Sequence, residues 1–327
     1  MRLHTVVCTV ILTLGLFVVP RAADAQPARK VWRIGFLGLG SGGIPEAFRQ
    51  GLRELGYVEG QNLAFEYRFP PDRKLDRLPE LAAELVRLPV DVIVAGGGPP
   101  VHAAKAATST IPIVFSGEPD PVSRGLIASW AHPGGNITGA AGAGTEFDTM
   151  KQLELLKEVV PAATRIAVLI PPDSPLYGTA VQHLQAAAQR LKIDLHLMEI
   201  RDPATELEPA FAALAREPVD AFFGLVSTYT PHRTRIVELV AAHRLPALYN
   251  VRAFVEAGGL MSYNEDVAAR HRRVAIMVDK ILRGATPADI PAEYPTKFHL
   301  AINLKTAKAL GMTIPAHLLV LADEVIQ

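Results

Sequence analysis

Two carboxylate side chains, Glu118 and Asp120, follow a short apolar run near the middle of the chain. The run, residues 111–115 (IPIVF), predicts a buried parallel strand. In open α/β sheets, ligands bind just beyond the carboxyl ends of the strands, so Ser116, Glu118 and Asp120 are predicted to face a ligand. A carboxylate at that position can pair with a ligand ammonium. Asp120 can also cap a helix predicted over residues 122–130, and the two roles are compatible.

Two other positions are candidates for binding an anionic group of a ligand. Gly97 and Gly98 follow a predicted strand over residues 90–95 and open a helix, where free backbone N–H groups favour a carboxylate. Arg252, beyond a predicted strand over residues 245–249, can form a bidentate pair with a carboxylate. The structural alternatives are a tight turn without a ligand and a solvated surface arginine, and the sequence leaves both open.

Aromatic and hydroxyl side chains stand at the remaining predicted cleft positions. Tyrosine rings can stack on a ligand ring while their hydroxyls donate hydrogen bonds, although each tyrosine is explained as well by packing. Serine and threonine offer neutral hydrogen bonds, with helix capping as the alternative. The candidates of this kind, with the polar and glycine residues beside them, are Ser41, Gly42, Asp173, Tyr177, Ser227, Thr228, Tyr229 and Tyr263.

These side chains are positioned by strands that alternate with helices along the chain, which predicts parallel sheets with right-handed crossovers. The predicted strands cover residues 33–37, 63–67, 90–95 and 111–115, and then 165–170, 193–200, 219–226 and 245–249. The fold class is therefore α/β, with two doubly wound parallel-sheet lobes joined by a three-strand hinge near residues 139, 263 and 293. Lobe 1 is predicted to comprise residues 31–139 plus 265–292, and lobe 2 residues 140–264 plus 293–327, ending in a helix over residues 316–326. A cleft between two such lobes is suited to closing around a ligand.

The first 25 residues have the pattern of a secretory signal peptide. Arg2 precedes an apolar run over residues 6–19, and Ala23-Asp24-Ala25 supplies the small residues of a cleavage site. The alternative is an uncleaved anchor, although the run is short for a membrane span. We therefore expect cleavage after about Ala25 and a periplasmic location.

Composition restricts the function further. The chain has 33 Lys and Arg and 33 Asp and Glu, a balance that argues against a nucleic-acid partner. Its one cysteine, Cys8, lies in the signal segment, so the mature chain has no disulfide, thiolate nucleophile or cysteine-ligated metal. We expect no metal, because no histidine pair has the spacing of a known zinc motif.

A match to the dinucleotide fingerprint at Gly38, Gly40 and Gly43 raises the alternative of an NAD-dependent enzyme, with Glu66 near the ribose-binding position. Pro45 sets the helix start after the glycines, which leaves them in a loop and disfavours a bound dinucleotide. No G-x-S-x-G elbow is present either. We predict no catalytic residues and no cofactor.

Six segments, taken in order, resemble the extracytoplasmic substrate-binding proteins of ABC transporters, and most closely the group that includes tryptophan-binding members. They are EAFRQGLRELGYVEGQNLAFEYR, LPELAAELVRLPVDVIVAGG, ATSTIPIVFSGEPDPVSRGL, PGGNITG, EAGGLMSYNED and PTKFHLAINLKTAKALGMTIP. The resemblance implies a type I periplasmic-binding fold that delivers a small solute to a membrane permease.

Position by position, the resemblance matches Asp120-Pro121 to the family's acid-proline pair. It also matches Ser262-Tyr263 to a small-aromatic pair, and Gly97 and Gly98 to the turn after the third strand. The chain departs from the family at Pro172-Asp173, where members often have Asn-Pro, and at Asn264, where they often have Gly. Both departures lie near the expected cleft, which puts an aromatic amino acid as ligand in doubt.

The sequence therefore predicts an exported, monomeric solute-binding protein of an ABC importer. Its ligand is a small carboxylated or amino-acid-like solute, captured by hinge closure without catalysis. A periplasmic sensor partner of a receptor, with the same fold, is the alternative. Sugars are disfavoured, because neither Trp32 nor Trp130 is placed to stack on a pyranose.

Overall fold

The computed structural model describes residues 30–39, 43–71, 74–174 and 176–327. The chain divides into a short N-terminal unit, residues 1–31, and a main unit, residues 32–327. The predicted signal peptide, and Ser41 and Gly42, lie outside the described residues. Among the residues that are described, no helix has the length and apolar character needed to cross a membrane.

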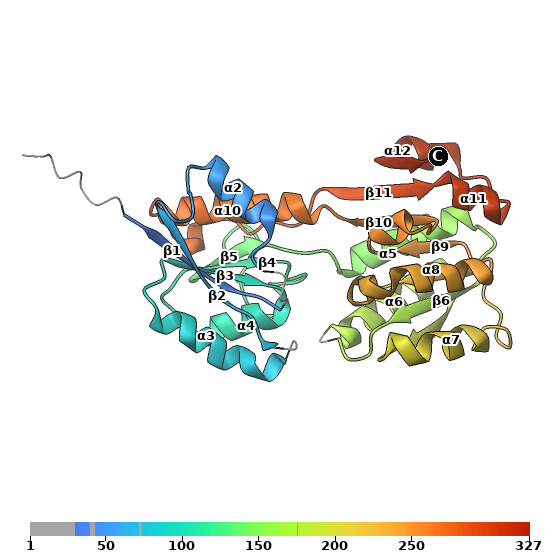
Figure 1. Cartoon of the computed structure of the whole chain (residues 1–327), viewed down its shortest axis with the longest axis horizontal. Helices are drawn as coiled ribbons and strands as arrows, with labels where there is room; N and C mark the ends of the chain where they lie inside the picture. The colour runs from blue at the N-terminus through green and yellow to red at the C-terminus, as the bar shows by residue number, and fades with distance from the viewer. Residues whose placement is uncertain (1–29, 40–42, 72–73, 175) are drawn as a thin grey trace, which may run out of the picture. The chain divides into compact units, whose positions relative to one another are not determined.

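The first sheet of the main unit has five parallel strands in the order β2-β1-β3-β4-β5 (Figure 1). In chain order the strands are β1 (Trp32–Leu37), β2 (Leu63–Arg68), β3 (Val92–Gly96), β4 (Ile113–Ser116) and β5 (Ile137–Ala140). Alternating side chains face opposite sides: Val94 packs with helices α2 (Glu46–Glu54) and α10 (Val267–Leu282), and Ile93 with α3 (Leu78–Arg87) and α4 (Gly98–Ala107). Two short 3-10 turns, Leu75–Arg77 and Pro287–Asp289, complete this part.

The second sheet has seven strands in the order β12-β11-β10-β9-β8-β6-β7. The strands are β6 (Arg165–Ile170), β7 (Asp194–Glu199), β8 (Ala221–Gly224), β9 (Ala247–Tyr249), β10 (Met261–Glu265), β11 (Phe298–Asn303) and β12 (Glu324–Ile326). One face is covered by α5 (Glu146–Val159), α6 (Tyr177–Leu191), α11 (Leu304–Leu310) and α12 (Ala316–Leu321). The other is covered by α7 (Pro203–Ala213), α8 (Arg233–Ala242) and α9 (Ala253–Glu256), with a 3-10 helix, η3 (Ser227–His232), before α8. The α/β class with two largely parallel sheets is confirmed, and β10–β11 is the antiparallel exception.

Three chain crossings connect the two sheets, and they lie beside one another (Figure 1). The first follows β5, the second joins β10 to α10, and the third leads into β11. Backbone hydrogen bonds join the first to the third, from Ala141 N to Glu293 O at 2.8 Å and from Glu293 N to Gly139 O at 2.9 Å. Asp266 N in the second donates to Lys297 O in the third at 3.0 Å. We keep the predicted lobe boundaries as working definitions of lobe 1 and lobe 2.

Two predicted helices are wrong. Residues 122–130 form a turn, because Gly125 has a φ of +68° and the Pro121 carbonyl accepts the amides of both Leu126 and Ile127. The terminal helix predicted over residues 316–326 ends at Leu321, and the remainder forms β12 on the edge of the second sheet. Strand pairing with β11 prevails there over a local helical pattern.

Candidate ligand-binding cleft

Two adjoining hollows, of about 530 and 560 Å³, form a cleft between the sheets. They share a central strip made of Pro171, Ser174, Leu176, Ser227 and Thr228. Most of the remaining lining comes from segments that follow β1, β3, β4 and β5, from segments that follow β6, β7, β8 and β9, and from α6. The cleft therefore lies at the carboxyl ends of strands from both sheets, where open α/β sheets bind ligands.

On lobe 1, four of the predicted residues line the cleft. Glu118 and Asp120 border the first hollow, and Gly97 and Gly98 border the second. Asp120 also caps the turn after it, since its Oδ1 accepts the Ser123 amide at 3.1 Å. Ser116 ends β4 as a buried residue outside the lining, and its hydroxyl has no hydrogen-bond partner among the described residues.

On lobe 2, five predicted residues line the cleft, and the side chains of three of these have internal partners. Ser227 and Thr228 are exposed at the start of η3, and Asp173 forms an exposed ion pair with Arg201 at 3.4 Å. The Tyr177 hydroxyl donates a hydrogen bond to the Glu199 carboxylate. Tyr229 is only 4% exposed and donates to the Ile200 carbonyl, and burial raises the pKa of its phenol. Tyr229 is thus held as part of the cleft wall.

The structure does not bring Arg252, Ser262 and Tyr263 into the cleft lining. Arg252 is held by two carboxylates, with Nε 2.6 Å from Glu324 Oε2 and Nη1 2.6 Å from Glu256 Oε1. Ser262 is fully buried in β10. The Tyr263 ring stacks on Phe298 with centroids 5.2 Å apart and planes 8° apart. These side chains support lobe 2 instead.

Glu118 has the most unusual environment in the cleft. It has no exposed surface, and neither carboxylate oxygen accepts a hydrogen bond from a described residue. Arg124 Nε lies 3.3 Å from Oε1, and His102 Nε2 lies 3.8 Å from Oε2. Burial raises the pKa of Glu118, and the Arg124 charge partly offsets that rise.

His102 completes this cluster on lobe 1. Arg124 Nε donates to His102 Nε2 at 3.2 Å, which requires that nitrogen to be unprotonated. Burial lowers the pKa of His102, and the positive charge of Arg124 lowers it further. The cluster therefore contains one negative charge, one positive charge and a neutral imidazole when Glu118 is ionised.

Among the lining residues that were not predicted from the sequence, two bear directly on binding. The first is Arg124, which lies in the segment predicted to be a helix and found to be a turn, and whose side chain lines the first hollow. Phe147 projects from the first turn of α5 and is 71% exposed although it is a large apolar side chain. A local signal for it existed: Thr145 and Asp148 form a capping box, which fixes the helix start and places Phe147 in the first turn.

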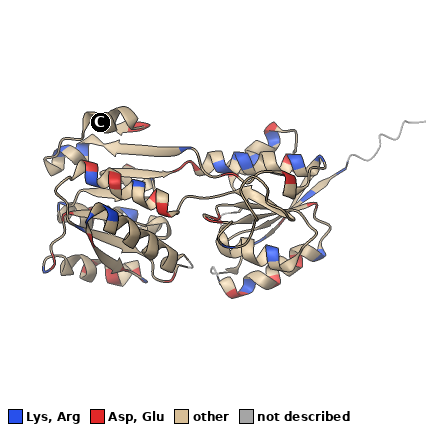
Figure 2. Ribbon diagram, turned by 180° about the vertical axis from the view of Figure 1, so that it is seen from behind, with Lys and Arg blue, Asp and Glu red and all other residues tan. Residues whose placement is uncertain are grey.

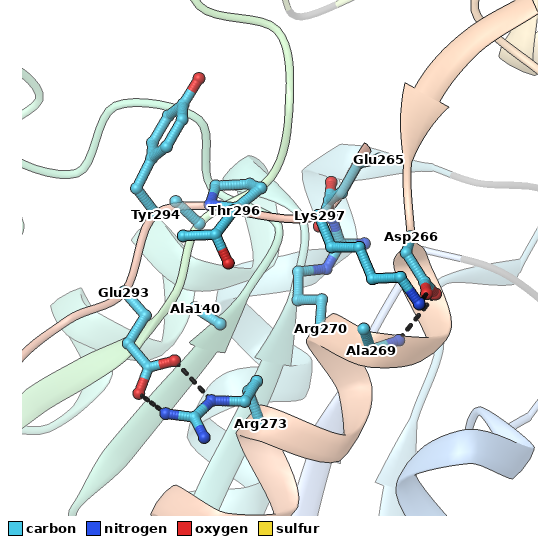
Figure 3. Close-up of a pocket in the computed structure, with 12 residues that line it drawn as sticks. Ala140, Glu265, Asp266, Ala269, Arg270, Arg273, Glu293, Tyr294, Thr296 and Lys297 are labelled. Carbon is cyan, nitrogen blue, oxygen red and sulfur yellow. Dashed lines mark hydrogen bonds and ion pairs between the residues drawn. The ribbon is translucent and has the colours of Figure 1, made fainter. Parts of the chain in front are cut away.

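A further hollow of about 510 Å³ lies at the crossings and is lined by charges of both signs (Figure 3). In its lining, the Glu293 carboxylate forms a direct ion pair with the Arg273 guanidinium, and Lys297 Nζ lies 3.1 Å from Asp266 Oδ2. In Figure 2, basic and acidic residues are interspersed along the helices of both lobes. Within the described part of the chain, no group of three or more His, Cys, Asp or Glu side chains can hold a metal ion.

The chain matches known proteins over most of its length. A model of the family described as ABC transporter substrate binding protein covers residues 42–326. A tyrosine-binding protein of Clostridioides difficile (strain R20291) is 25% identical over 268 residues, which span 82% of this chain and 76% of that protein.

Two solved structures share the architecture. A conserved domain protein from Vibrio cholerae has 26% identity and a TM-score of 0.77, covering 90% of this chain and 100% of that one. An ABC domain from Streptococcus pneumoniae in complex with L-Trp has 25% identity and a TM-score of 0.77, covering 91% and 100%. With the two-sheet topology, these matches confirm the predicted type I periplasmic-binding fold.

Proposed function

We propose, from the premise that this chain belongs to the family of ABC transporter substrate binding proteins, that it captures a small amino-acid-like or carboxylated solute for a membrane permease. The observation that carries the proposal is the cleft, whose lining combines strand-end loops from both sheets. A solute that touches both walls stabilises the arrangement in which the walls are close, and so shifts the protein toward a closed form. A permease can then distinguish loaded from empty protein.

Closure is expected to occur about the three crossings. They are adjacent and joined by backbone hydrogen bonds, so small torsional changes in a few residues can rotate one lobe against the other. The lobes themselves have separate apolar cores on both faces of each sheet, which favours movement as rigid bodies.

The relatives support an amino acid as the solute. One is a tyrosine-binding protein and another was solved with L-Trp, and both ligands combine an ammonium, a carboxylate and an aromatic ring. The cleft offers a matching mixture: a carboxylate at Asp120, hydroxyls at Ser227 and Thr228, and the exposed Phe147 side chain. The differences at Pro172-Asp173 and Asn264 favour a solute related to these amino acids and different in detail.

Export and a lack of catalysis belong to the same proposal. A substrate-binding protein of an importer works outside the cytoplasm, as a monomer that carries its solute to the membrane. Removal of residues 1–25 would begin the mature chain at Gln26. Mass spectrometry of the protein recovered from a periplasmic fraction tests this, and an unprocessed chain that remains in the membrane fraction would contradict it.

The decisive experiment is a thermal-shift screen of the chain expressed from Gln26. Amino acids, aromatic acids, short carboxylates, sugars and NAD are added in turn. A solute at a hundred times its Kd stabilises the folded state by about 2.7 kcal/mol, which raises the melting temperature visibly. A rise in melting temperature with amino acids or carboxylates supports the proposal, whereas a rise with NAD alone would contradict it.

A matched pair of variants shows whether the solute binds in the cleft. Thr179 and Gln182 are both exposed on α6, and Thr179 lines the cleft while Gln182 does not. Thr179→Trp fills the cleft and should abolish the thermal shift. Gln182→Trp adds the same ring outside the cleft and should leave the shift intact.

A further inference from the structure

The two anion-binding positions predicted from the sequence are both occupied by the protein's own carboxylates. A Cβ atom placed on Gly98 would lie 3.0 Å from Glu118 Oε2, so this carboxylate rests directly against the first residue of α4. Arg252 is occupied by Glu324 and Glu256. A solute carboxylate therefore needs another partner in the cleft.

Arg124 is available for that role. Its side chain lines the first hollow and is 34% exposed, so a solute can reach it. Only Nε contacts His102 and Glu118, and the two terminal nitrogens make no hydrogen bond to a described residue. A guanidinium held in this way offers its outer edge to a planar anion, in the geometry that suits a bidentate carboxylate.

Glu118 and His102 fix the inner edge of the guanidinium. Glu118 is completely buried and contributes a counter-charge 3.3 Å from Nε, and His102 accepts the Nε hydrogen. Holding a long side chain in one orientation before binding reduces the entropy that binding would otherwise cost. The pair acts through Arg124 as positioning residues.

The charges around Arg124 restrict the solute further. The cleft lining contains four carboxylates (Glu118, Asp120, Glu146 and Asp173) and two guanidiniums (Arg124 and Arg201) among the described residues. This surplus of negative charge disfavours a simple anion and favours a solute that brings its own positive charge. Asp120 is exposed and lines the same hollow as Arg124, which suits a solute ammonium.

We propose that Arg124 binds the carboxylate of a zwitterionic, amino-acid-like solute, oriented for this task by Glu118 and His102. The assignment rests on the proposed function and specifies its binding chemistry. It replaces Gly97, Gly98 and Arg252 as the carboxylate-binding group.

The test uses calorimetric titration with three probes that share an indole ring: L-tryptophan, tryptamine without the carboxylate, and indole-3-propionate without the ammonium. Loss of charge-assisted hydrogen bonds from Arg124→Gln should raise the Kd for L-tryptophan roughly 10- to 100-fold. The Kd for tryptamine should stay within about twofold, since it has no carboxylate for Arg124 to bind. Arg124→Lys keeps the charge without the fork and serves as a milder variant if Arg124→Gln folds poorly.

Matched controls separate binding from structure. Arg252→Gln removes the arginine favoured by the sequence, which lies outside the cleft lining, and should not change tryptophan affinity by more than about twofold. Glu118→Gln should weaken tryptophan binding and spare tryptamine, because it loosens the orientation of Arg124 only.

Three results would overturn the assignment. Unchanged tryptophan binding in Arg124→Gln would refute it and leave the solute-binding function standing. Equal losses for tryptophan and tryptamine would show a structural effect. Failure of the unaltered protein to bind any amino acid would remove this assignment, and the proposed function would fall with it only if no other carboxylated solute bound either.

Discussion

Arg270 donates a hydrogen bond from Nη1 to Oε2 of Glu265 at 2.5 Å, and both side chains are largely buried at the crossings between the lobes. The same carboxylate oxygen accepts the Ala143 amide at 2.9 Å. One ion pair therefore joins the start of α10 and the end of β10 to the first crossing. Burial raises the pKa of Glu265, and the charge of Arg270 works against that rise.

Removing Arg270 should destabilise the fold strongly, because it leaves the Glu265 carboxylate buried without its cation. Arg270→Ala is expected to lower the free energy of unfolding by about 3–5 kcal/mol. Arg273→Ala is the control on the same helix: its pair with Glu293 is 51% and 32% exposed. That control should cost about 0–1 kcal/mol. Denaturant unfolding measures both, and equal losses would contradict the distinction.

Gly142 is expected to tolerate no side chain. A Cβ atom there would lie 2.9 Å from the Gly117 Cα and 3.0 Å from Arg270 Nη1, so backbone would have to move. Gly142→Ala should destabilise by about 1–3 kcal/mol. Gly178→Ala, in α6 with nothing within 4 Å, should instead stabilise by about 0.5 kcal/mol. A stable Gly142→Ala protein in thermal unfolding would show that the crossings adapt easily.

His271 on α10 should make the protein sensitive to acid. Burial, with help from Arg270, lowers the pKa of His271 to about 4. Because the unfolded chain takes up this proton first as the pH falls, the stability it contributes is present above about pH 6.5 and lost toward pH 4. The loss should reach roughly 2–3 kcal/mol.

The measurement compares unfolding free energies at pH 7 and pH 4.5 for the unaltered protein and His271→Gln. The variant should lose less stability between the two values. Burial raises the pKa of Glu118 and Glu265, which acts in the opposite direction in both proteins and so cancels in the comparison. His132→Gln, at an exposed position, is the control. Parallel pH profiles for the unaltered protein and His271→Gln would refute the prediction.

Phe147 should contribute to solute affinity without contributing to stability. Phe147 is 71% exposed and lines the cleft, and contact with an apolar solute would remove part of that surface from water. Phe147→Ala is expected to weaken tryptophan binding about tenfold, with an unchanged melting temperature of the free protein. Val320→Ala, at an 84% exposed apolar residue outside the cleft, should change neither quantity. A lower melting temperature in Phe147→Ala would point to packing instead.

Much of the fold follows from local sequence signals. The strand predicted over residues 165–170 coincides with β6, and the strand predicted over residues 63–67 differs from β2 by one residue. The apolar pattern was sufficient there, because the residues that decide the structure are neighbours in the chain. The prediction of a helix over residues 122–130 was wrong, because the positive φ of Gly125 ends the turn before a helix can form.

The cleft was less predictable, because its chemistry depends on partners that are distant in sequence. The sequence alone indicates that Arg252 is free to bind a ligand carboxylate. In the fold, β12 places Glu324, 72 residues later, with its Oε2 2.6 Å from Arg252 Nε. Gly98 was predicted to bind an anionic group of a ligand, but the Glu118 carboxylate already lies against it. The positions of the strand ends predicted which loops meet at the cleft. They did not predict which charged and polar groups there are already paired within the protein, because those partners are distant in sequence.

Lobe 1 is built from two segments that nearly the whole of lobe 2 separates in the sequence. Tyr57 donates a hydrogen bond to Asp279 at 2.8 Å across 222 residues, and α10 shares one core with α2. Such contacts form late, because long loops must close and α10 is synthesised after most of lobe 2. The sheet of lobe 2 is likewise incomplete until β11 and β12, at the end of the chain, have been synthesised. The order of assembly therefore keeps both halves unfinished until synthesis is nearly complete, and a truncated chain would expose the apolar face of α2 to chaperones and proteases.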